Sequence, residues 1–352
     1  MRFFICFLCL GAGYFLGHAQ QIDQKDNSRE VSPLFKKEKL LKFSLHYSKT
    51  NMLSLTNDST YLKSKMVYQF QEEDPNTVAI ELRARGNYRK KNCYYLPLKL
   101  KIDKSISKGT PFEEDKKLKL VLPCLKSNKA NDHVIKELLA YKIYELLSPY
   151  YFQARMVSIA LEEDTGKKKI DHDLMGILIQ DDKNLAHDYR GKIIKRRIHP
   201  KNQDAVSSAR NALFQYMIGN TDYSTAYQHN EKLFYLDDKI VPVPYDFDMS
   251  GLVNTSYAVV SAIKNKPLPI EKVTDRLFIG FVRDEAVFQE VRNDFLAKEA
   301  LVFEMMDQHN KLFKDPRELE EAKNFLAGFY KLLKDDKKFE NRIIKKARTK
   351  LE

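Results

Sequence analysis

Apolar residues change their spacing along this chain, and the change limits the folds that the chain can adopt. In the first third, short runs alternate apolar and polar side chains, a period of two that is typical of half-buried β-strands. These runs cover residues 41–47, 78–84, 96–102 and 118–122, and two later strands are expected over 155–161 and 174–181. Elsewhere apolar residues recur mainly at helical spacing. The sequence therefore predicts an α+β protein that begins with an antiparallel β-region.

The predicted helices follow from this second spacing and from their end signals. Apolar residues at helical intervals cover residues 131–147, 205–217 and 286–306. Asn131-Asp132 offers an N-cap for the first of these helices. Asp315-Pro316 has the form of another helix start, because Asp is a good N-cap and Pro is favoured at the first helical position. The second half of the chain is therefore expected to be mainly helical.

The N-terminus has the pattern of a secretory signal. Arg2 precedes an apolar run over residues 3–16, and the small-x-small sequence Gly17-His18-Ala19 follows. The run is shorter than the roughly 20 residues that a membrane-spanning helix needs. We therefore expect residues 1–19 to be a cleaved signal peptide and residues 20–38 a flexible linker. The mature protein is expected to be secreted or periplasmic, with no integral membrane segment.

The two cysteines that remain after cleavage leave two interpretations open. Removing residues 1–19 leaves only Cys93 and Cys124. In an oxidising compartment, an even pair of this kind is suited to a single disulfide. The alternative is two reduced and half-buried thiols.

The charge balance favours anionic partners. The chain has 60 Lys and Arg against 48 Asp and Glu, a formal charge of +12. Such a balance suits nucleotides, lipid headgroups and other acidic surfaces. Nucleic acid is not favoured, because the aromatic residues do not alternate with Lys and Arg in one platform. The basic end over residues 331–350 is either a solvated helix face or a peripheral contact with an anionic envelope surface.

Acidic and amide side chains gather between Gly219 and Gly251. Asp222 and Asn230 fall on a predicted loop, and a predicted hairpin then leads to Asp246 and Asp248. Mg²⁺ retains much of its water and takes only one or two protein carboxylates together with substrate phosphates. The order of these residues is that of a catalytic Asp, a metal-binding Asn and a metal-binding Asp in phosphoryl-transfer enzymes. Taken singly, each residue is better read as an ordinary turn former, and only the set in this order favours the metal-binding interpretation.

Four segments in this order resemble the spore-coat protein H (CotH-like) family of secretory atypical kinases. The likeness is closer to a group of secreted bacterial proteins that belong with that family. The segments are Arg83-Ala84-Arg85-Gly86-Asn87 with Arg89-Lys90-Lys91 and Leu98-Lys99-Leu100-Lys101, then Lys136–Lys142, then Gly176–Asp181, and finally Asn220-Thr221-Asp222 with Asn230 and Pro244–Asp248.

The resemblance implies an atypical protein-kinase-like fold. A β-rich N-lobe with one long helix would cover residues 39–180, and a mainly helical C-lobe would cover residues 181–352. The two lobes would enclose ATP with Mg²⁺ or Mn²⁺, and phosphate would pass to a hydroxyl of a protein partner.

The resemblance also implies roles for the residues of the fourth segment. Asp222 would be the catalytic Asp, and Asn230 and Asp246 the metal ligands. Asp248 would be a nearby acid that supports the metal.

The other three segments supply the expected nucleotide-binding residues. Lys99 would neutralise nucleotide phosphates, with Glu137 on the first long helix as its partner. Arg85 would contact phosphate, and Gln180 would lie where a strand leads to the hinge. The plainer interpretation is that Lys99 is a solvated strand residue and that Arg85 pairs with an acid.

The sequence departs from kinase patterns in ways that support an alternative function. It contains no Gly-x-Gly-x-x-Gly loop in the first half, and the spacing from Asp222 to Asn230 exceeds that of ordinary protein kinases. A catalytically inactive kinase-like module with a binding or envelope-structural role is the first alternative. A metal-dependent hydrolase is the second, although the His cluster usual in such sites is missing from the sequence.

Overall fold

The computed structural model describes residues 31–36, 40–70, 73–263 and 266–351. Residues 31–352 form one compact unit. The predicted signal peptide, residues 1–19, lies outside the described residues, as does most of the predicted linker. The part of the linker that is described contains the short helix α1 (Pro33–Lys36), in which Leu34 and Phe35 are buried.

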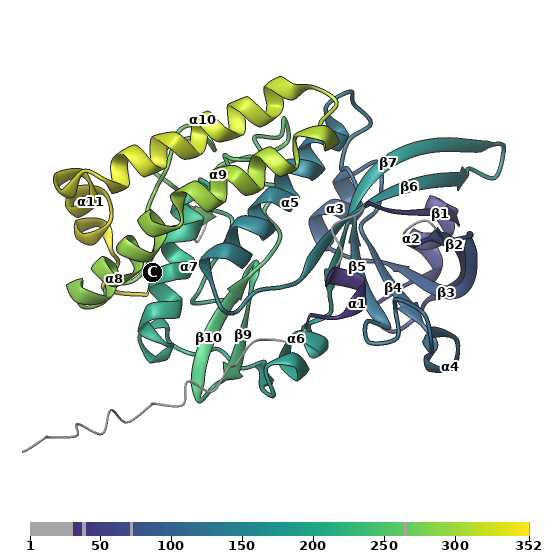
Figure 1. Ribbon diagram of the computed structural model, residues 1–352, viewed down its shortest axis with the longest axis horizontal. Helices are drawn as coiled ribbons and strands as arrows, with labels where there is room; N and C mark the ends of the chain where they lie inside the picture. Colours follow the sequence, from purple (N-terminus) through teal and green to yellow (C-terminus); the bar gives the residue numbers. More distant parts are fainter. Residues whose placement is uncertain (1–30, 37–39, 71–72, 264–265, 352) are drawn as a thin grey trace, which may run out of the picture. The chain divides into compact units, whose positions relative to one another are not determined.

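Seven strands form a closed barrel in the order β1-β2-β3-β4-β5-β7-β6 (Figure 1). The strands are β1 (Leu41–Tyr47), β2 (Leu62–Gln69), β3 (Asn76–Ala84), β4 (Leu98–Ile102), β5 (Lys117–Val121), β6 (Ala154–Asp164) and β7 (Lys169–Gln180). Alternate residues of each strand point inward, as Leu98, Leu100 and Ile102 do on β4. The remaining side chains of β4, Lys99 and Lys101, therefore lie on the outside of the barrel.

The closed barrel shows that the expected kinase-like fold with two lobes is wrong. Strand β1 pairs antiparallel with β2 on one side and parallel with β6 on the other, so the sheet has no open edge there. The alternation of apolar residues shows which face of a strand is buried, but it does not show which strands pair. The parallel pair joins Leu41 to Val157, residues that lie far apart in the sequence. The α+β class holds overall.

Helix α5 (Ala130–Leu147) links β5 to β6 and is buried on almost every side. It packs on β6 and β7 of the barrel and on α9 and α10 of the helical part. Its expected cap differs, because Lys129 is the N-cap and makes no side-chain capping bond. The Asp132 carboxylate instead accepts hydrogen bonds from the backbone of Lys314 and Asp315, at 2.8 and 3.2 Å. Asp132, expected as part of the cap of α5, thus fixes the start of the helix that begins at Pro316.

The helical part follows the barrel in sequence (Figure 1). Its helices are α7 (Ala205–Met217), α8 (Glu285–Ala297), α9 (Glu299–Gln308), α10 (Pro316–Leu333) and α11 (Asp336–Arg342). The single helix expected over residues 286–306 is divided at Lys298 into α8 and α9. Asp315 caps α10 as expected, since its side chain accepts a hydrogen bond from the backbone of Arg317.

A small antiparallel sheet with the order β10-β9-β8 carries the predicted hairpin. Its strands are β8 (Lys192–Ile194), β9 (Glu231–Leu236) and β10 (Lys239–Pro244). Pro242 and Pro244 lie on β10, at the edge of this sheet, where a residue without an N–H is tolerated. The short elements are α2 (Lys49–Leu55), α3 (Asn87–Asn92), α4 (Lys104–Ser107), α6 (Asp182–Asp188), β11 (Ala262–Ile263), β12 (Lys266–Pro267) and the 3₁₀ turns Pro200–Asn202, Asn310–Leu312 and Ile344–Lys346.

Cys93 and Cys124 form a disulfide, which decides between the two interpretations of the sequence. Cys93 is the C-cap of α3, and Cys124 lies just after β5. The bond therefore fastens the end of α3 to the barrel.

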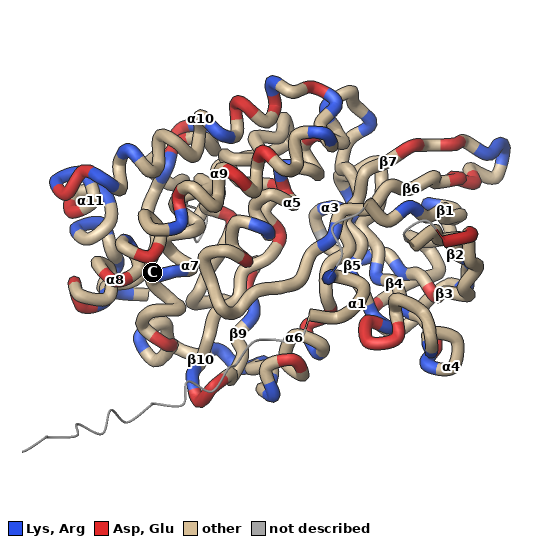
Figure 2. Tube along the Cα trace, viewed as in Figure 1, with Lys and Arg blue, Asp and Glu red and all other residues tan. Residues whose placement is uncertain are grey.

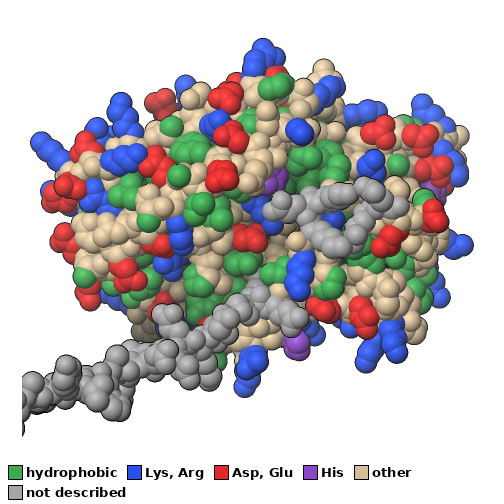
Figure 3. Space-filling model, in the orientation of Figure 1, with side chains coloured by type: hydrophobic (Ala, Val, Ile, Leu, Met, Phe, Trp, Pro, Cys, Tyr) green, Lys and Arg blue, Asp and Glu red, His purple; other side chains and the backbone are tan. Residues whose placement is uncertain are grey.

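Three cations of the basic C-terminal stretch pair with acids of the helical part. Lys334, Lys338 and Lys345 form ion pairs of 2.7–2.9 Å with Glu299, Asp335 and Glu340. On the face shown in Figure 3, Lys and Arg are interspersed with Asp and Glu. These contacts favour a solvated helix face. Among the described helices, none is both long and apolar enough to cross a membrane.

Candidate functional site

A cavity of about 800 Å³ lies where the barrel meets the helical part. The end of β3 and helix α3 form one wall, and the loop before β9 and the segment after β10 form another. The segment 259–262, with Ile279 and Phe281, and the C-terminal residues Arg348 and Leu351 complete the lining. Its polar lining includes Arg85, Arg89, Asp222, His229, Asn230, Asp246, Asp248, Ser261 and Arg348.

Asp222 lies in the loop that follows α7, and its carboxylate accepts three side-chain hydrogen bonds. The donors are Asn230 Nδ2 at 2.9 Å, His229 Nε2 at 3.1 Å and Ser261 Oγ at 3.2 Å. Burial by itself would raise the pKa of Asp222, but the hydrogen bonds from these three residues outweigh it and lower the pKa. The carboxylate is therefore ionised at neutral pH.

Asn230 connects the Asp222 loop to the strand that leads to Asp246. Its Nδ2 donates to the backbone oxygen of Asp222 at 2.7 Å, and its own backbone oxygen accepts from the N–H of Tyr245 at 3.0 Å. The residue has φ = 50°, a left-handed conformation that Asn tolerates better than most residues. An Asn at this position therefore has a structural role as well as any role towards a ligand.

Asp246 has φ = 66°, which is uncommon for a residue other than Gly. Its backbone N–H donates to the Tyr141 hydroxyl at 2.9 Å, so helix α5 supports this turn. The turn directs the carboxylate towards Arg89. Strained backbone that is held by neighbouring groups is frequent at functional sites.

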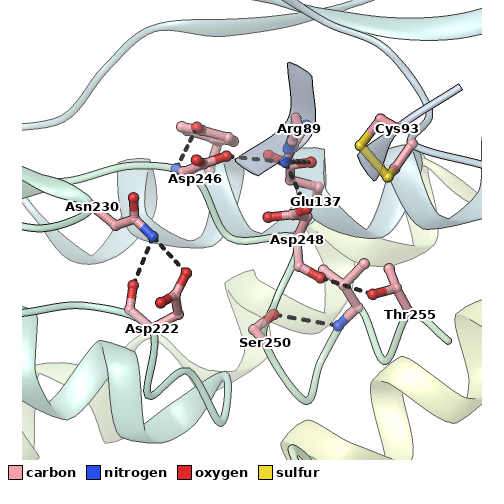
Figure 4. A network of polar contacts seen from close by, with 12 residues as sticks. Arg89, Cys93, Glu137, Asp222, Asn230, Asp246, Asp248, Ser250 and Thr255 are labelled. Atoms are coloured by element: carbon pink, nitrogen blue, oxygen red, sulfur yellow. Dashed lines mark hydrogen bonds and ion pairs between the residues drawn. A yellow bond between two sulfur atoms is a disulfide. The ribbon is translucent and has the colours of Figure 1, made fainter. Parts of the chain in front are cut away.

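Arg89 lies at the centre of a buried charge cluster (Figure 4). Its Nη2 lies 2.9 Å from Asp248, 3.0 Å from Asp246 and 3.4 Å from Glu137. Burial opposes the charge on Arg89, but the carboxylates around it raise its pKa well above the usual value. Burial raises the pKa of Glu137 to about 8, and it also raises that of Asp248, although Arg89 opposes both shifts. At neutral pH we therefore place a proton on Glu137.

The structure brings some of the expected site residues together. Asp222, Asn230, Asp246 and Arg85 all line the cavity. Asp248 also lines it, but its carboxylate is buried against Arg89 and accepts a hydrogen bond from the Tyr257 hydroxyl at 2.9 Å. Asp248 therefore supports Arg89 rather than presenting a free ligand.

The expected pair of Lys99 and Glu137 is wrong. Glu137 contacts Arg89, whereas Lys99 lies on the outside of the barrel and forms an ion pair of 2.9 Å with Asp181. A strand pattern shows that Lys99 points outward, but not which acid it meets. Gln180, also expected at the nucleotide, donates to Asp188 at 2.7 Å and does not line the cavity.

Oxygen atoms of two expected ligands suit a hard divalent cation. Within the described ranges, no residue donates a hydrogen bond to Asn230 Oδ1 or Asp246 Oδ2. Mg²⁺ and Mn²⁺ prefer such oxygens. No group of three or more His, Cys, Asp or Glu in the described part of the chain is arranged to hold a metal. By the chemistry of their oxygens, Asn230 and Asp246, and not Asp248, are the residues that would hold a cation here.

Sequence reasoning missed several cavity residues. Arg89 stood in a basic run with no sign that it alone turns inward, and Ser261 and Arg348 come from distant segments. His229 directly precedes Asn230, and this proximity was the one signal that pointed to it.

No protein-family model matches this chain, and no curated protein is significantly similar to it in sequence. The resemblance to CotH-like kinases therefore stays a prediction.

Proposed function

We propose that the protein is a phosphotransferase that moves the terminal phosphoryl group of ATP to a hydroxyl of a protein partner. The observation that carries this proposal is a pair of guanidinium groups in the cavity. Arg85 and Arg348 line the same cavity as Asp222, Asn230 and Asp246, and neither forms an ion pair with another described residue. Guanidinium groups that have no acidic partner, in a cavity of this size, favour a phosphate-bearing ligand.

The ionised carboxylate of Asp222 is suited to orient the acceptor hydroxyl. It accepts the hydroxyl proton while the new oxygen–phosphorus bond forms and the bond from phosphorus to ADP breaks. Arg85 and Arg348 offset the negative charge of the phosphates. A divalent cation, when bound, would supply further neutralisation, with Asn230 and Asp246 as its protein ligands.

The proposed compartment is outside the cytoplasm. The Cys93–Cys124 disulfide supports this, because such bonds persist in oxidising compartments and are rare in the cytosol. The predicted signal peptide points the same way.

One observation favours a second candidate, an inactive module that binds a ligand without transferring phosphate. Arg89 already pairs with Asp246 and Asp248, so part of their negative charge is offset without a metal. A site of this kind can bind an anion through Arg85 and Arg348 and yet lack the cation that phosphoryl transfer requires.

The test combines ligand-dependent thermal unfolding with mass spectrometry. ATP with Mn²⁺ should raise the melting temperature of the wild type, because a ligand of the folded state stabilises it. Asp246→Ala should lose most of this gain. Phosphate should accumulate on the wild-type protein or an added acceptor protein, and not with Asp222→Ala.

The outcomes separate the candidates. A thermal gain without phosphate transfer supports the inactive binding module. No gain at any ATP concentration contradicts the phosphotransferase. A gain that Asp246→Ala keeps in full would contradict the assigned metal ligands.

A further inference from the structure

A second pocket, of about 520 Å³, lies on the outer face of the barrel. Its walls come from the segment before β2, from strands β2 to β5 and from the start of α6. It shares no lining residue with the carboxylate cavity. Six cations line it against three acids, and the cations are Lys63, Arg83, Lys99, Lys101, Lys117 and Lys183. Figure 2 shows Lys and Arg on the neighbouring strands β4 and β5.

The strand register places like charges directly opposite one another. Arg83 on β3 faces Lys99 on β4, and Lys99 in turn faces Lys119 on β5. In the next row, Lys101 faces Lys117 on β5, although it faces Glu81 on β3. Like charges in directly opposite positions destabilise a sheet. These like-charged pairs lower the stability of the sheet. Residues that lower stability without a structural gain are expected at functional sites.

Acids neutralise only part of this face. Arg83, Lys99 and Lys101 form ion pairs of 2.8–3.1 Å with Asp58, Asp181 and Glu81. The other three cations of the pocket form no ion pair with any residue that the structure describes; they are Lys63, Lys117 and Lys183. The pocket therefore retains an excess of three positive charges.

An aromatic ring adds a feature that a simple charged surface lacks. Tyr61 lines the pocket, with the Arg83 guanidinium 5.5 Å and the Lys101 ammonium 5.8 Å from the centre of its ring. Both cations lie within the range of a cation–π contact. An aromatic ring that is only partly buried therefore lies beside two of the cations in the pocket wall.

We propose that this pocket binds a small molecule that carries several closely spaced phosphate groups. The cations that lack an ion pair supply the charge, and the pocket has the volume of a small-molecule site. The backbones of β2, β5 and α6 place these exposed lysines, Lys63, Lys117 and Lys183, around the same pocket. The site needs neither a divalent cation nor the carboxylate cavity, so it is independent of the proposed phosphotransferase function. Lys99 belongs to this second site.

The test is calorimetric binding of inorganic tripolyphosphate, with EDTA present and at about 50 mM salt so that screening is weak. The variant Lys117→Gln/Lys183→Gln leaves every ion pair in the pocket intact. It should weaken binding at least about tenfold, because each lost contact is charge-assisted. The matched control Lys311→Gln/Lys331→Gln removes two exposed cations elsewhere and should change the affinity less than about twofold.

Further arms identify the site and the ligand. Arg348→Gln should leave the tripolyphosphate binding that depends on Lys117 and Lys183 unchanged, whereas loss of all tripolyphosphate binding in this variant would place the anion in the carboxylate cavity and overturn the proposal. Absence of binding to the wild type, or equal losses in the two double variants, would also overturn it. The source of the phosphates follows from a comparison of ATP with tripolyphosphate. If ATP binds more tightly and Tyr61→Leu abolishes the difference, the preferred ligand is a nucleotide. If the two affinities are equal, the preferred ligand is inorganic polyphosphate.

Discussion

The guanidinium of Arg89 joins groups from three parts of the chain, and this makes it the most constrained charge in the site. It links α3 to Glu137 on α5 and to Asp246 and Asp248 after β10. One cation cannot balance two buried carboxylates, Glu137 and Asp248, and the partly buried Asp246, so the cluster holds a proton. A buried ion pair adds little net stability, but the removal of one partner leaves a buried charge unpaired and is costly.

We predict that Arg89→Met lowers the free energy of unfolding by about 3–5 kcal/mol. Part of this loss should be recovered in acid, because the carboxylates that have lost their cation become protonated. Urea unfolding at several pH values measures both effects. Arg85→Met is the matched control, since Arg85 forms no ion pair with the described residues, and it should cost less than about 0.5 kcal/mol. Equal losses in the two variants would contradict the central role of Arg89.

Glu231 provides a pH-dependent prediction outside the site. Its side chain is fully buried, and burial raises its pKa from 4.5 to about 8, although Thr225 and Asn211 donate hydrogen bonds that oppose the shift. The folded state therefore binds this proton more tightly than the unfolded state. The resulting stability is complete below about pH 4.5 and is lost as the pH rises through about 8.

We therefore predict that Glu231→Gln gains stability relative to the wild type as the pH rises. The difference between their free energies of unfolding should be nearly constant below about pH 4.5, should grow by up to about 1.4 kcal/mol per pH unit between about pH 4.5 and 8, and should level off above that. Denaturant unfolding at a series of pH values measures this difference. Parallel curves for the two proteins would show that Glu231 titrates normally.

Among the secondary-structure elements, those with a regular local pattern were predictable. The alternation over residues 41–47 gave β1 with the same bounds, and helical spacing gave α7 from Ala205 to Met217. Two elements failed for local reasons. The predictions omitted strand β2, in which Val67 is exposed, and the apolar pattern over residues 286–306 continued through the break at Lys298. Periodicity records which side chains are buried, but not where a helix ends without a cap signal.

The stability of helix α3 comes from the disulfide at its C-terminal end more than from its own hydrogen bonds, because the helix is short. It spans only Asn87–Asn92, yet it carries Arg89, and the N–H of Cys93 donates to the backbone oxygen of Arg89 at 2.9 Å. Its N-cap is Gly86, which has no side chain to accept a capping bond. A helix this short is marginal by itself. The bond to Cys124 therefore helps to keep Arg89 next to its acids.

We predict that the variant Cys93→Ser/Cys124→Ser loses about 3–4 kcal/mol of unfolding free energy, the loop-entropy value for a separation of 31 residues. Protease cleavage near α3 should also become faster, because the helix is released. The wild type under a reducing agent should show the same losses, and the agent should leave the double variant unchanged. A double variant as stable as the wild type would contradict this account.

The molecule as a whole could not be assembled from the sequence, because its closure rests on a contact between distant segments. Each barrel strand reads as half-buried, and this is equally true in an open sheet and in a barrel. The pairing of β1 with β6 decides between them. The same limit applies to the site: the order of Asp222, Asn230 and Asp246 predicted that they meet, whereas the positions of Arg89 and Arg348 depend on how the barrel meets the helices.

Barrel closure makes a prediction that hydrogen exchange can test in the intact protein. Successive N–H groups of a strand point to opposite sides, so in an open sheet every second amide of an edge strand faces solvent. Strand β1 (Leu41–Tyr47) is paired on both sides, with β2 and with β6. All its interior amides should therefore exchange slowly, as those of a central strand do. Strand β8 (Lys192–Ile194), which pairs only with β9 in its sheet, is the internal control and should show fast exchange at alternate residues. Alternating fast and slow amides in β1 would mean that its pairing with β6 is lost in solution and that the barrel is open there.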